Sequence, residues 1–405
     1  YVCAVGRFGF DSIEEGSRVR SPLQKVDGAF TAVAWEDVLS VLVEVCQRAT
    51  TKEIVTAGNL LNEDLLTVRR LTEAAGFQGA SSTVGFYGDV PSLIGGQVDI
   101  QEADLVVLVG LAPSQWEGVF PALDVTLRHM VRRGAKLVVV NAADTRIAQV
   151  AHAVLTGDEL ASVQRLTEIL NSERSPVSVN HEAEQAAAEL YAQANRPVIV
   201  TIPAFSQVSR NLALKKGQVL SVPFEANGKG TLLMGITGKP TIDTDTPDVL
   251  YALGDVAVPR PENAGFVVSQ CSHVSGLACE ADLVLPVATV YESHGTIVDY
   301  VENLRTLSPV ITPRAASRLH REILQEVAQR LGLDVAAAAT ADVVEQVERF
   351  QSGQSTFRSV EKRTDFLCNP HSVVLGLHLP LVRSRRLSRL NDLHKAFSNP
   401  DIGLI

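Results

Sequence analysis

The chain has 405 residues, of which 46% are hydrophobic and only 5% aromatic, and its formal net charge is −10 at pH 7. This length exceeds one ordinary core, and a composition rich in Ala, Val and Leu is typical of an α/β protein with parallel strands. The acidic charge argues against nucleic acid as a partner, because phosphate binding needs a basic surface.

No apolar run is long enough to span a bilayer and no signal peptide is visible, so we expect a cytoplasmic protein without a direct membrane span. The cysteines are few and scattered: Cys3, Cys46, Cys271, Cys279 and Cys368. An odd, widely spaced set does not look like a disulfide framework, and it favours a reducing compartment. The chain opens at Tyr1 rather than Met, as expected of a fragment or a processed product.

The first half of the chain alternates short apolar runs with helical patterns. Strands are predicted at residues 53–58, 104–110 and 136–141. Helices are predicted at residues 35–46, 63–75, 121–133 and 161–170. Asn62 is a plausible N-cap for the second helix, and Pro121 starts the third. The third helix ends in basic residues that complement the helix dipole: Arg128, His129, Arg132 and Arg133.

A polar stretch at residues 171–176 is the predicted linker, and the pattern then restarts. The later elements are strands at residues 197–202, 265–270 and 283–285, and helices at 181–194, 317–331 and 341–350. This alternation implies two doubly wound, mostly parallel α/β domains, expected at residues 46–175 and 176–351. Residues 352–405 lack periodicity. They are either a partly ordered tail or a basic arm that wraps a partner subunit.

Residues 281–305 are the most informative stretch. A buried run leads to Pro286, and a Glu-x-x-Gly-Thr turn follows at residues 292–296, before Glu302 and Arg305. This segment, together with residues 3–10, 18–23 and 34–39, resembles the molybdopterin oxidoreductase superfamily. That superfamily includes formate dehydrogenases, nitrate reductases and the large iron–sulfur subunit of NADH:quinone oxidoreductase.

The resemblance covers roughly residues 1–350. It implies the two central α/β domains of the formate dehydrogenase type (domains II and III), without the C-terminal β-barrel. Residues 1–45 would then be the end of an iron–sulfur domain and the helix that leads into the first α/β domain.

The resemblance also implies one metal ligand. In the superfamily, the cysteine that corresponds to Cys3 is the last of four thiolates on a [4Fe–4S] cluster. Its three partners are absent from this chain, so Cys3 is either a fourth cluster ligand whose partners lie elsewhere or a thiol without metal. Members that pass electrons between cluster and pterin carry a lysine two residues later. Val5 stands there in this chain and cannot stabilise the transferred negative charge.

The pterin-binding residues of the superfamily are mostly replaced. Residues 79–89, which would supply the molybdenum ligand, lack cysteine, and Ser81 and Ser82 there are expected turn formers. Asn141 stands where an acidic residue grips the nucleotide, with Asp144 close by. Asn227 and Gly228 lie in a segment similar to one that lines the cofactor cavity, although a tight structural loop is the simpler interpretation. These last four residues are cofactor contacts only if a pterin is retained.

Two other groupings have competing interpretations. Cys271, His273 and Cys279 could indicate a metal site but lack a fourth ligand, so a strand-to-turn segment is favoured. Glu292 and His294 could act as an acid–base pair. We expect instead that Glu292, as part of the family signature, ties a loop through hydrogen bonds.

The retained fold motifs and the lost chemical residues favour a scaffold or electron-transfer subunit of a multisubunit NADH dehydrogenase-type complex. Its partners would be other iron–sulfur and flavin subunits, through which it could lie peripherally at a membrane. Molybdopterin is not expected, and this chain would not itself carry the substrate chemistry. The alternatives are a catalytic, formate dehydrogenase-like subunit with its other domains on separate chains, and an assembly protein without a redox centre.

Overall fold

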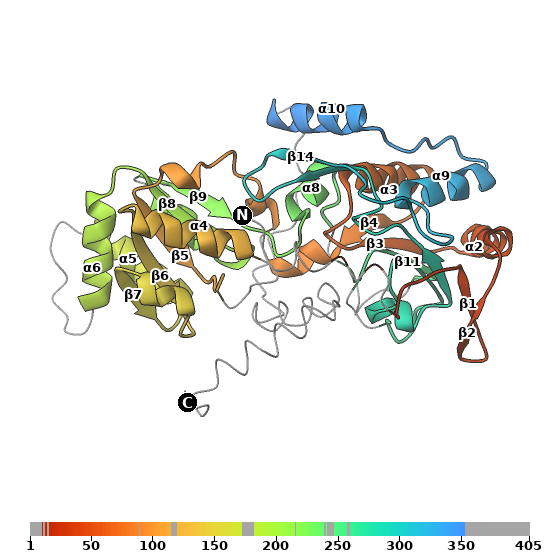
Figure 1. Cartoon of the computed structure of the whole chain (residues 1–405), viewed down its shortest axis with the longest axis horizontal. Coiled ribbons are helices and arrows are strands. Elements are labelled where there is room, and N and C mark those ends of the chain that lie inside the picture. Colours follow the sequence, from red (N-terminus) through yellow and green to blue (C-terminus); the bar gives the residue numbers. More distant parts are fainter. Residues whose placement is uncertain are drawn as a thin grey trace.

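A computed structural model describes residues 10, 13, 16–88, 90–114, 120–171, 182–214, 216–238, 240, 247–256 and 260–352. These residues form two lobes that lie side by side, each built around its own sheet (Figure 1). The positions of Cys3, Val5 and Cys368, and the tail beyond residue 352, lie outside the described residues.

The first sheet has the strand order β2-β1-β12-β11-β10-β3-β4 among the described residues. The strands are β1 (Leu23–Val26), β2 (Ala29–Ala32), β3 (Lys52–Thr56), β4 (Gly79–Ser82), β10 (Val249–Leu253), β11 (Phe266–Cys271) and β12 (Leu283–Pro286). Strands β12, β11, β10, β3 and β4 are parallel, while β1 and β2 form an antiparallel edge. Every residue of β10 and β12 is buried, as expected for parallel strands covered on both faces.

The second sheet is parallel throughout, in the order β7-β6-β5-β8-β9. Its strands are β5 (Leu105–Val109), β6 (Lys136–Asn141), β7 (Ala153–Thr156), β8 (Pro197–Thr201) and β9 (Gln218–Ser221). Its two faces carry separate hydrophobic clusters, because alternate strand residues such as Val106 and Val107 point to opposite sides.

Helices cover both sheets (Figure 1). We call the first sheet and its helices the seven-stranded lobe, whose helices are α2 (Trp35–Arg48), α3 (Asn62–Ala74), α8 (Gly228–Leu233), α9 (His320–Arg330) and α10 (Thr340–Gln351). The five-stranded lobe has α4 (Pro121–Arg132), α5 (Glu159–Asn171), α6 (Glu182–Gln193) and α7 (Ser206–Ala213). Short 3-10 helices lie at Thr83–Tyr87, Val90–Leu93, Ile100–Glu102, Arg146–Val150, Pro203–Phe205 and Gly276–Cys279.

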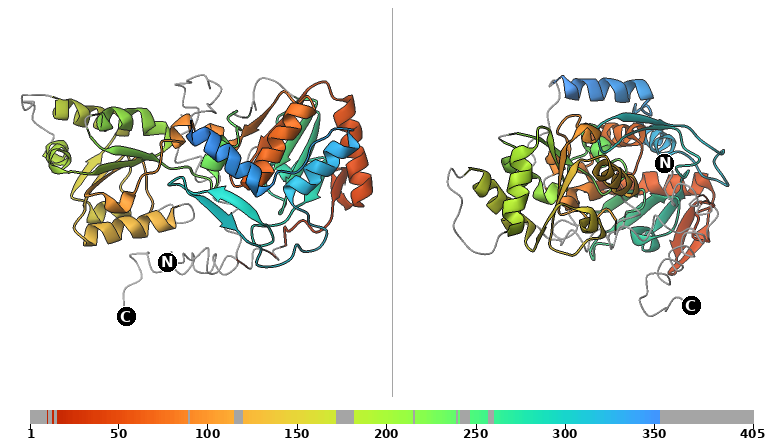
Figure 2. Two further views of the ribbon diagram at one scale, coloured as in Figure 1. Left: turned by 90° about the horizontal axis from the view of Figure 1, so that it is seen from above. Right: turned by 60° about the vertical axis from the view of Figure 1, so that its left-hand side comes forward.

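An antiparallel hairpin joins the lobes. It consists of β13 (Gly295–Val298) and β14 (Leu304–Leu307) and lies between the two lobes in the left view of Figure 2. At its tip, Tyr300 and Val301 pack against a hydrophobic cluster of the five-stranded lobe. The neighbouring Glu302 accepts hydrogen bonds from Lys229 Nζ at 3.0 Å and from Gly95 N at 2.9 Å. The hairpin therefore holds the lobes together through both apolar and ionic contacts.

The predicted α/β class with mostly parallel sheets is confirmed. The boundary expected near residue 175, however, falls within the five-stranded sheet, because β8 and β9 join β5–β7. The chain leaves the first sheet after β4 and returns to it at β10, a long-range pairing that local periodicity does not contain. The N-cap prediction was wrong: Asn62 is the first residue of α3 and Leu61 is its N-cap.

Candidate functional site

Ligands of doubly wound proteins bind beyond the carboxyl ends of the strands, where the strand order reverses. In the seven-stranded sheet this switch point lies between β3 and β10, and in the five-stranded sheet between β5 and β8. A ligand site of this fold is therefore expected at one of these two edges.

In the five-stranded sheet, an aromatic ring fills the switch point. Gly110 follows β5 with a φ of +67°, and a Cβ atom added there would lie 2.3 Å from Cε2 of Phe205, which follows β8. Only a glycine leaves room for this ring. The ring therefore packs directly against the turn that follows β5.

In the seven-stranded sheet, a carboxylate lies beside the switch point, at the carboxyl ends of β3 and β4. Gly58 N, in the turn after β3, donates to Glu225 Oε1 at 2.9 Å. The Thr83 hydroxyl lies 2.7 Å from Oε1 and 2.8 Å from Oε2 of the same carboxylate. Sequence reasoning missed Glu225, although it stands two residues before Asn227 in the segment singled out for the cofactor cavity.

Asn227 is wholly buried, and both ends of its amide are engaged within the chain. Its Nδ2 donates to Leu60 O at 2.6 Å and to Asn62 Oδ1 at 2.9 Å, while its Oδ1 accepts from Val298 N at 2.7 Å. Gly228 starts α8, and a Cβ atom there would lie 2.6 Å from Pro223 Cβ. Asn227 is thus bonded within the chain, and Gly228 has no room for a side chain.

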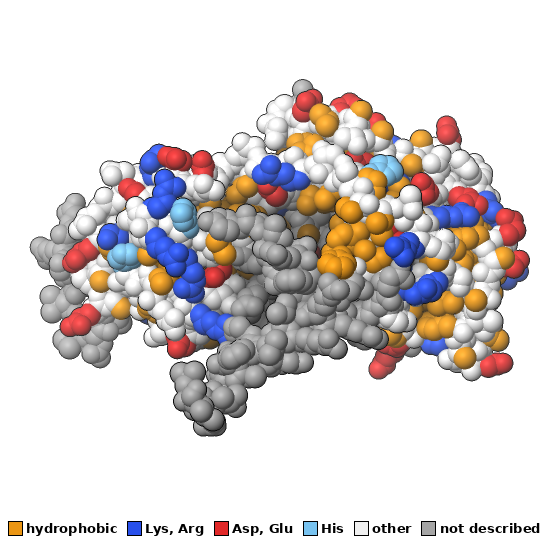
Figure 3. Space-filling model, in the orientation of Figure 1, with side chains coloured by type: hydrophobic (Ala, Val, Ile, Leu, Met, Phe, Trp, Pro, Cys, Tyr) orange, Lys and Arg blue, Asp and Glu red, His pale blue; other side chains and the backbone are white. Residues whose placement is uncertain are grey.

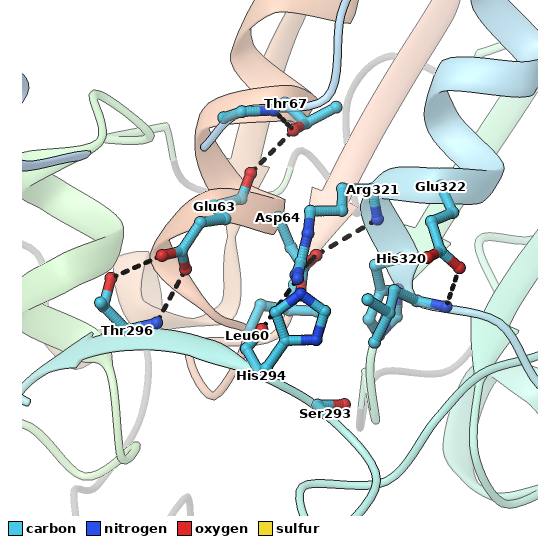
Figure 4. A network of polar contacts seen from close by, with 12 residues as sticks. Leu60, Glu63, Asp64, Thr67, Ser293, His294, Thr296, His320, Arg321 and Glu322 are labelled. Carbon is cyan, nitrogen blue, oxygen red and sulfur yellow. Dashed lines mark hydrogen bonds and ion pairs between the residues drawn. The ribbon is translucent and has the colours of Figure 1, made fainter. Parts of the chain in front are cut away.

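The amino end of α3 carries a buried polar network (Figure 4). Glu63 Oε2 accepts from Thr296 N at 2.8 Å, and its Oε1 accepts from the hydroxyls of Thr296 and Thr340 at 3.1 and 2.9 Å. Asn62 Nδ2 donates to the Thr296 hydroxyl at 3.1 Å. The Gly-Thr pair of the family signature thus joins β13 to the start of α3.

Beside this network, a buried ion pair joins α3 to α9. Asp64 Oδ1 accepts from Arg321 Nη1 at 3.1 Å and from Arg321 N at 3.2 Å, and Arg321 Nη2 donates to His294 O at 2.8 Å (Figure 4). Burial raises the pKa of Asp64 above its ordinary value, although Arg321 opposes the shift. Burial, reinforced by Arg321, lowers the pKa of His320 to about 3, so its imidazole is neutral at pH 7.

The other predicted contact pair lies at the end of β6. Asn141 Nδ2 donates to Leu111 O at 3.2 Å, and its Oδ1 accepts from Ala143 N at 3.0 Å. Asp144 is exposed. Asn141 and Asp144 belong to the five-stranded lobe, whereas Asn227 and Gly228 belong to the seven-stranded lobe. Next to Asp144, the buried Thr145 Oγ1 has no hydrogen-bond partner among the described residues.

The remaining groupings have structural roles. Ser81 and Ser82 lie in β4 rather than in a turn, and their hydroxyls donate to Glu53 Oε1 and to Thr56 O at 2.9 and 3.1 Å. Glu292 accepts from Arg18 Nη2 at 2.7 Å, Thr289 N at 2.7 Å and Arg314 N at 3.0 Å. These bonds confirm its predicted loop-tying role. His294 is exposed, and its carbonyl rather than its ring joins the network.

A cavity of about 560 Å³ lies at the opposite, amino edge of the five-stranded sheet, where Asp104, Ala135 and Arg196 precede strands β5, β6 and β8. His129 and Arg133 of α4 and its following turn also line it. Lysine, arginine and histidine side chains gather on this lobe in Figure 3. The cavity mixes these cations with Glu102 and Asp104, so its charge does not select one class of ligand.

Within the described residues, no three His, Cys, Asp or Glu side chains converge to hold a metal ion. Of the cysteines there, Cys46 and Cys271 are buried and Cys279 is exposed. No helix in the same part of the chain is both long and apolar enough to cross a membrane.

Comparison with known proteins is consistent with this fold. NADH-quinone oxidoreductase subunit 3 of Thermus thermophilus is 25% identical over 377 residues, which cover 82% of this chain and 46% of the relative. The G-type subunit of the Streptomyces coelicolor NADH-quinone oxidoreductase is 23% identical over 402 residues, covering 78% and 47%. A putative formate dehydrogenase of Bacillus subtilis is 25% identical over 171 residues, covering 36% and 17%. The chain spans about half the length of the first two relatives.

Solved structures share the fold at low identity. Acetylene hydratase from Pelobacter acetylenicus superimposes with a TM-score of 0.62 at 13% identity, over 82% of this chain and 64% of that chain. A chain of the formyltransferase/hydrolase complex from Methylorubrum extorquens gives 0.57 at 14% identity, over 77% and 98%. A sequence model described as molybdopterin oxidoreductase matches residues 18–330, most of the length, and the chain therefore belongs to the molybdopterin oxidoreductase family.

Proposed function

We propose that this chain is a scaffold or electron-transfer subunit of a multisubunit, NADH dehydrogenase-type redox complex, in which the pterin site of the family has been lost. One observation carries the proposal: the chain's own side chains lie against a glycine turn at the carboxyl edge of each sheet. Phe205 lies over Gly110 at the β5–β8 switch point, and Glu225 lies over Gly58 between the ends of β3 and β4. Turns filled in this way favour a fold kept for assembly rather than for binding a cofactor between the lobes.

The residues present do not fit a pterin dinucleotide. Its diphosphate is an anion, and at the turn after β3 it would meet the Glu225 carboxylate, which already accepts the bonds of Gly58 and Thr83. Asn227 would have to give up three bonds within the chain to contact any ligand. We therefore assign no reaction step to a molybdenum or tungsten centre on this chain.

The family relatives named as NADH-quinone oxidoreductase subunits support a place in such a complex. The proposed partners are other iron–sulfur and flavin subunits, and the complex would lie peripherally at a membrane. Cys3 remains the proposed fourth ligand of a [4Fe–4S] cluster whose other thiolates come from outside this chain.

Metal and pterin analysis of the native complex tests this proposal. We expect iron but no stoichiometric molybdenum or tungsten by mass spectrometry, and no pterin fluorescence after denaturation and oxidation. A catalytic formate dehydrogenase purified in parallel is the positive control. Molybdenum or tungsten that co-purifies one-to-one with this chain would contradict the proposal.

One observation favours a second candidate, a catalytic formate dehydrogenase-like subunit. The buried Thr145 hydroxyl has no partner among the described residues and lies beside the exposed Asp144 at the end of β6. If a pterin is retained, its contacts would include Asn141, Asp144, Asn227 and Gly228. The same metal and pterin measurements distinguish the two candidates, since only this one predicts both signals.

A further inference from the structure

We propose that the Glu225 carboxylate is the resident anion of the turn between β3 and α3, and that this turn is a phosphate-binding turn kept closed by the chain itself. The inference rests on the proposed loss of the pterin, because it identifies what would replace an external phosphate at the turn after β3.

The donors around Glu225 are those that a phosphate receives in a βα turn. They include the backbone amide of Gly58, 2.9 Å from Oε1, and the Thr83 hydroxyl, within 2.8 Å of both carboxylate oxygens. Backbone amides and hydroxyls in such turns bind anions. The carboxylate supplies two of the oxygens that a phosphate would bring.

The fit is close. A Cβ atom on Gly58 would lie 2.8 Å from Glu225 Oε2 and 2.3 Å from Val84 Cγ2. Asn227 N donates to Gly58 O at 2.8 Å, which fixes the segment carrying Glu225 against the turn. No ligand can approach the Gly58 backbone while this side chain is in place.

The charge of Glu225 matters as well as its size. An apolar residue could fill the volume, as Phe205 does over Gly110, but it would leave the Gly58 amide and the Thr83 hydroxyl without an acceptor. Buried donors without acceptors destabilise a fold. A carboxylate both fills the turn and satisfies its donors, so its removal should leave a turn that accepts a free anion.

The experiment uses the full chain and four variants, Glu225→Ala, Glu225→Ser, Glu225→Gln and Phe205→Ala. Thermal unfolding is followed in sodium phosphate or sodium pyrophosphate against sodium chloride of equal ionic strength, and binding is measured by calorimetry. Glu225→Ala should unfold at a lower temperature than the wild type. Phosphate at roughly tenfold its dissociation constant should raise the Tm of this variant by about 2 °C more than that of the wild type.

Glu225→Gln retains an acceptor and the volume, so phosphate should not rescue it, and Phe205→Ala should lose stability without rescue. If Glu225→Ala does not fold, Glu225→Ser, which also opens the turn, is read in the same way. Equal stabilisation of all variants by phosphate, or a folded Glu225→Ala chain that binds no phosphate, would overturn the proposal. Stoichiometric molybdenum in the native complex would contradict the proposed function instead. The phosphate experiment is independent of that measurement, so the two failures can be told apart.

Discussion

The carboxyl edges of the two sheets in this molecule are closed by different chemistry. At the five-stranded sheet, the Phe205 ring lies over Gly110 and the crevice is apolar. At the seven-stranded sheet, Glu225 lies over Gly58, and nearby Asn227 and Glu63 bond to backbone and side chains from distant segments. One edge is closed by packing, and the other by a set of buried hydrogen bonds and charges.

This difference has an energetic consequence. A buried polar group contributes little net stability when it is satisfied, but it costs a large penalty when its partner is removed. The carboxyl edge of the seven-stranded sheet should therefore tolerate polar substitutions much less well than the edge of the five-stranded sheet. Matched substitutions in the two lobes test this difference.

The largest effect is expected from Arg321→Met. It leaves the Asp64 carboxylate buried without its cation, which should lower the free energy of unfolding by about 3–5 kcal/mol at pH 7. Burial already raises the pKa of Asp64, and a carboxyl whose folded pKa is raised regains stability as the pH falls through that pKa. Urea denaturation should therefore show a smaller loss at pH 5 than at pH 8.

The double variant Asp64→Asn with Arg321→Met is the control for that prediction. It removes the buried charge together with its partner, so it should be more stable than Arg321→Met alone. A double variant that is no more stable than the single one would show that the ion pair does not account for the loss.

The next largest effect comes from a pair of matched asparagines. Asn227→Ala leaves Val298 N, Leu60 O and Asn62 Oδ1 without their partner, and should cost about 3 kcal/mol. Asn141→Ala removes two bonds rather than three, one of them to the buried Leu111 carbonyl, and should cost about 1–2 kcal/mol. Chemical denaturation of both variants measures the difference, and equal losses would contradict the comparison between the lobes.

A pH dependence follows from His320. Its pKa of about 3 in the folded protein lies below the ordinary 6.5, so the unfolded chain binds one more proton between these values. Stability should therefore fall as the pH drops from about 6.5 towards 3, by about 1.4 kcal/mol per pH unit from this group. Gln270 Nε2, which lies 3.0 Å from His320 Nδ1, would lose an acceptor when that nitrogen gains the proton.

His320→Gln should flatten this slope, as measured by urea denaturation at several pH values. The free energy of unfolding of the variant is subtracted from that of the wild type at each pH, because Asp64, whose pKa is raised, contributes to the slope in the opposite sense. His129→Gln is the matched control, since His129 is exposed on α4. An unchanged slope in His320→Gln would show that this imidazole does not govern the acid sensitivity.

Much of the secondary structure could be predicted from local sequence, but the order in which the strands pair could not. The apolar run at residues 104–110 and the Pro121 start of α4 were recognisable because burial and helix geometry leave short-range patterns. The pairing of β3 with β10 was not, since its partners lie almost two hundred residues apart. Asn62 looked like an N-cap because asparagine is a preferred capping residue. Its side chain instead bonds to Thr296 and Asn227, which are distant in the sequence.

The candidate site shows the same limit. The sequence pointed to Asn227 and Gly228 through their resemblance to a cofactor segment, yet only the structure brings Glu225 onto Gly58 and Phe205 onto Gly110. A glutamate before a glycine-rich loop has no local signature of anion replacement. The ionic contact of Lys229 with Glu302 is equally non-local, because it depends on the hairpin tip reaching α8.

The smallest effect is expected from a pair of threonines at the two edges. Thr145→Val replaces a buried hydroxyl that has no partner among the described residues, so stability should change by no more than about 0.5 kcal/mol. Thr296→Val removes the bonds to Asn62 and Glu63 and should cost about 2 kcal/mol. Urea denaturation of the two isosteric variants gives the comparison directly. A loss in Thr145→Val as large as that in Thr296→Val would mean that the Thr145 hydroxyl has a partner in solution, and the two edges would then be closed alike.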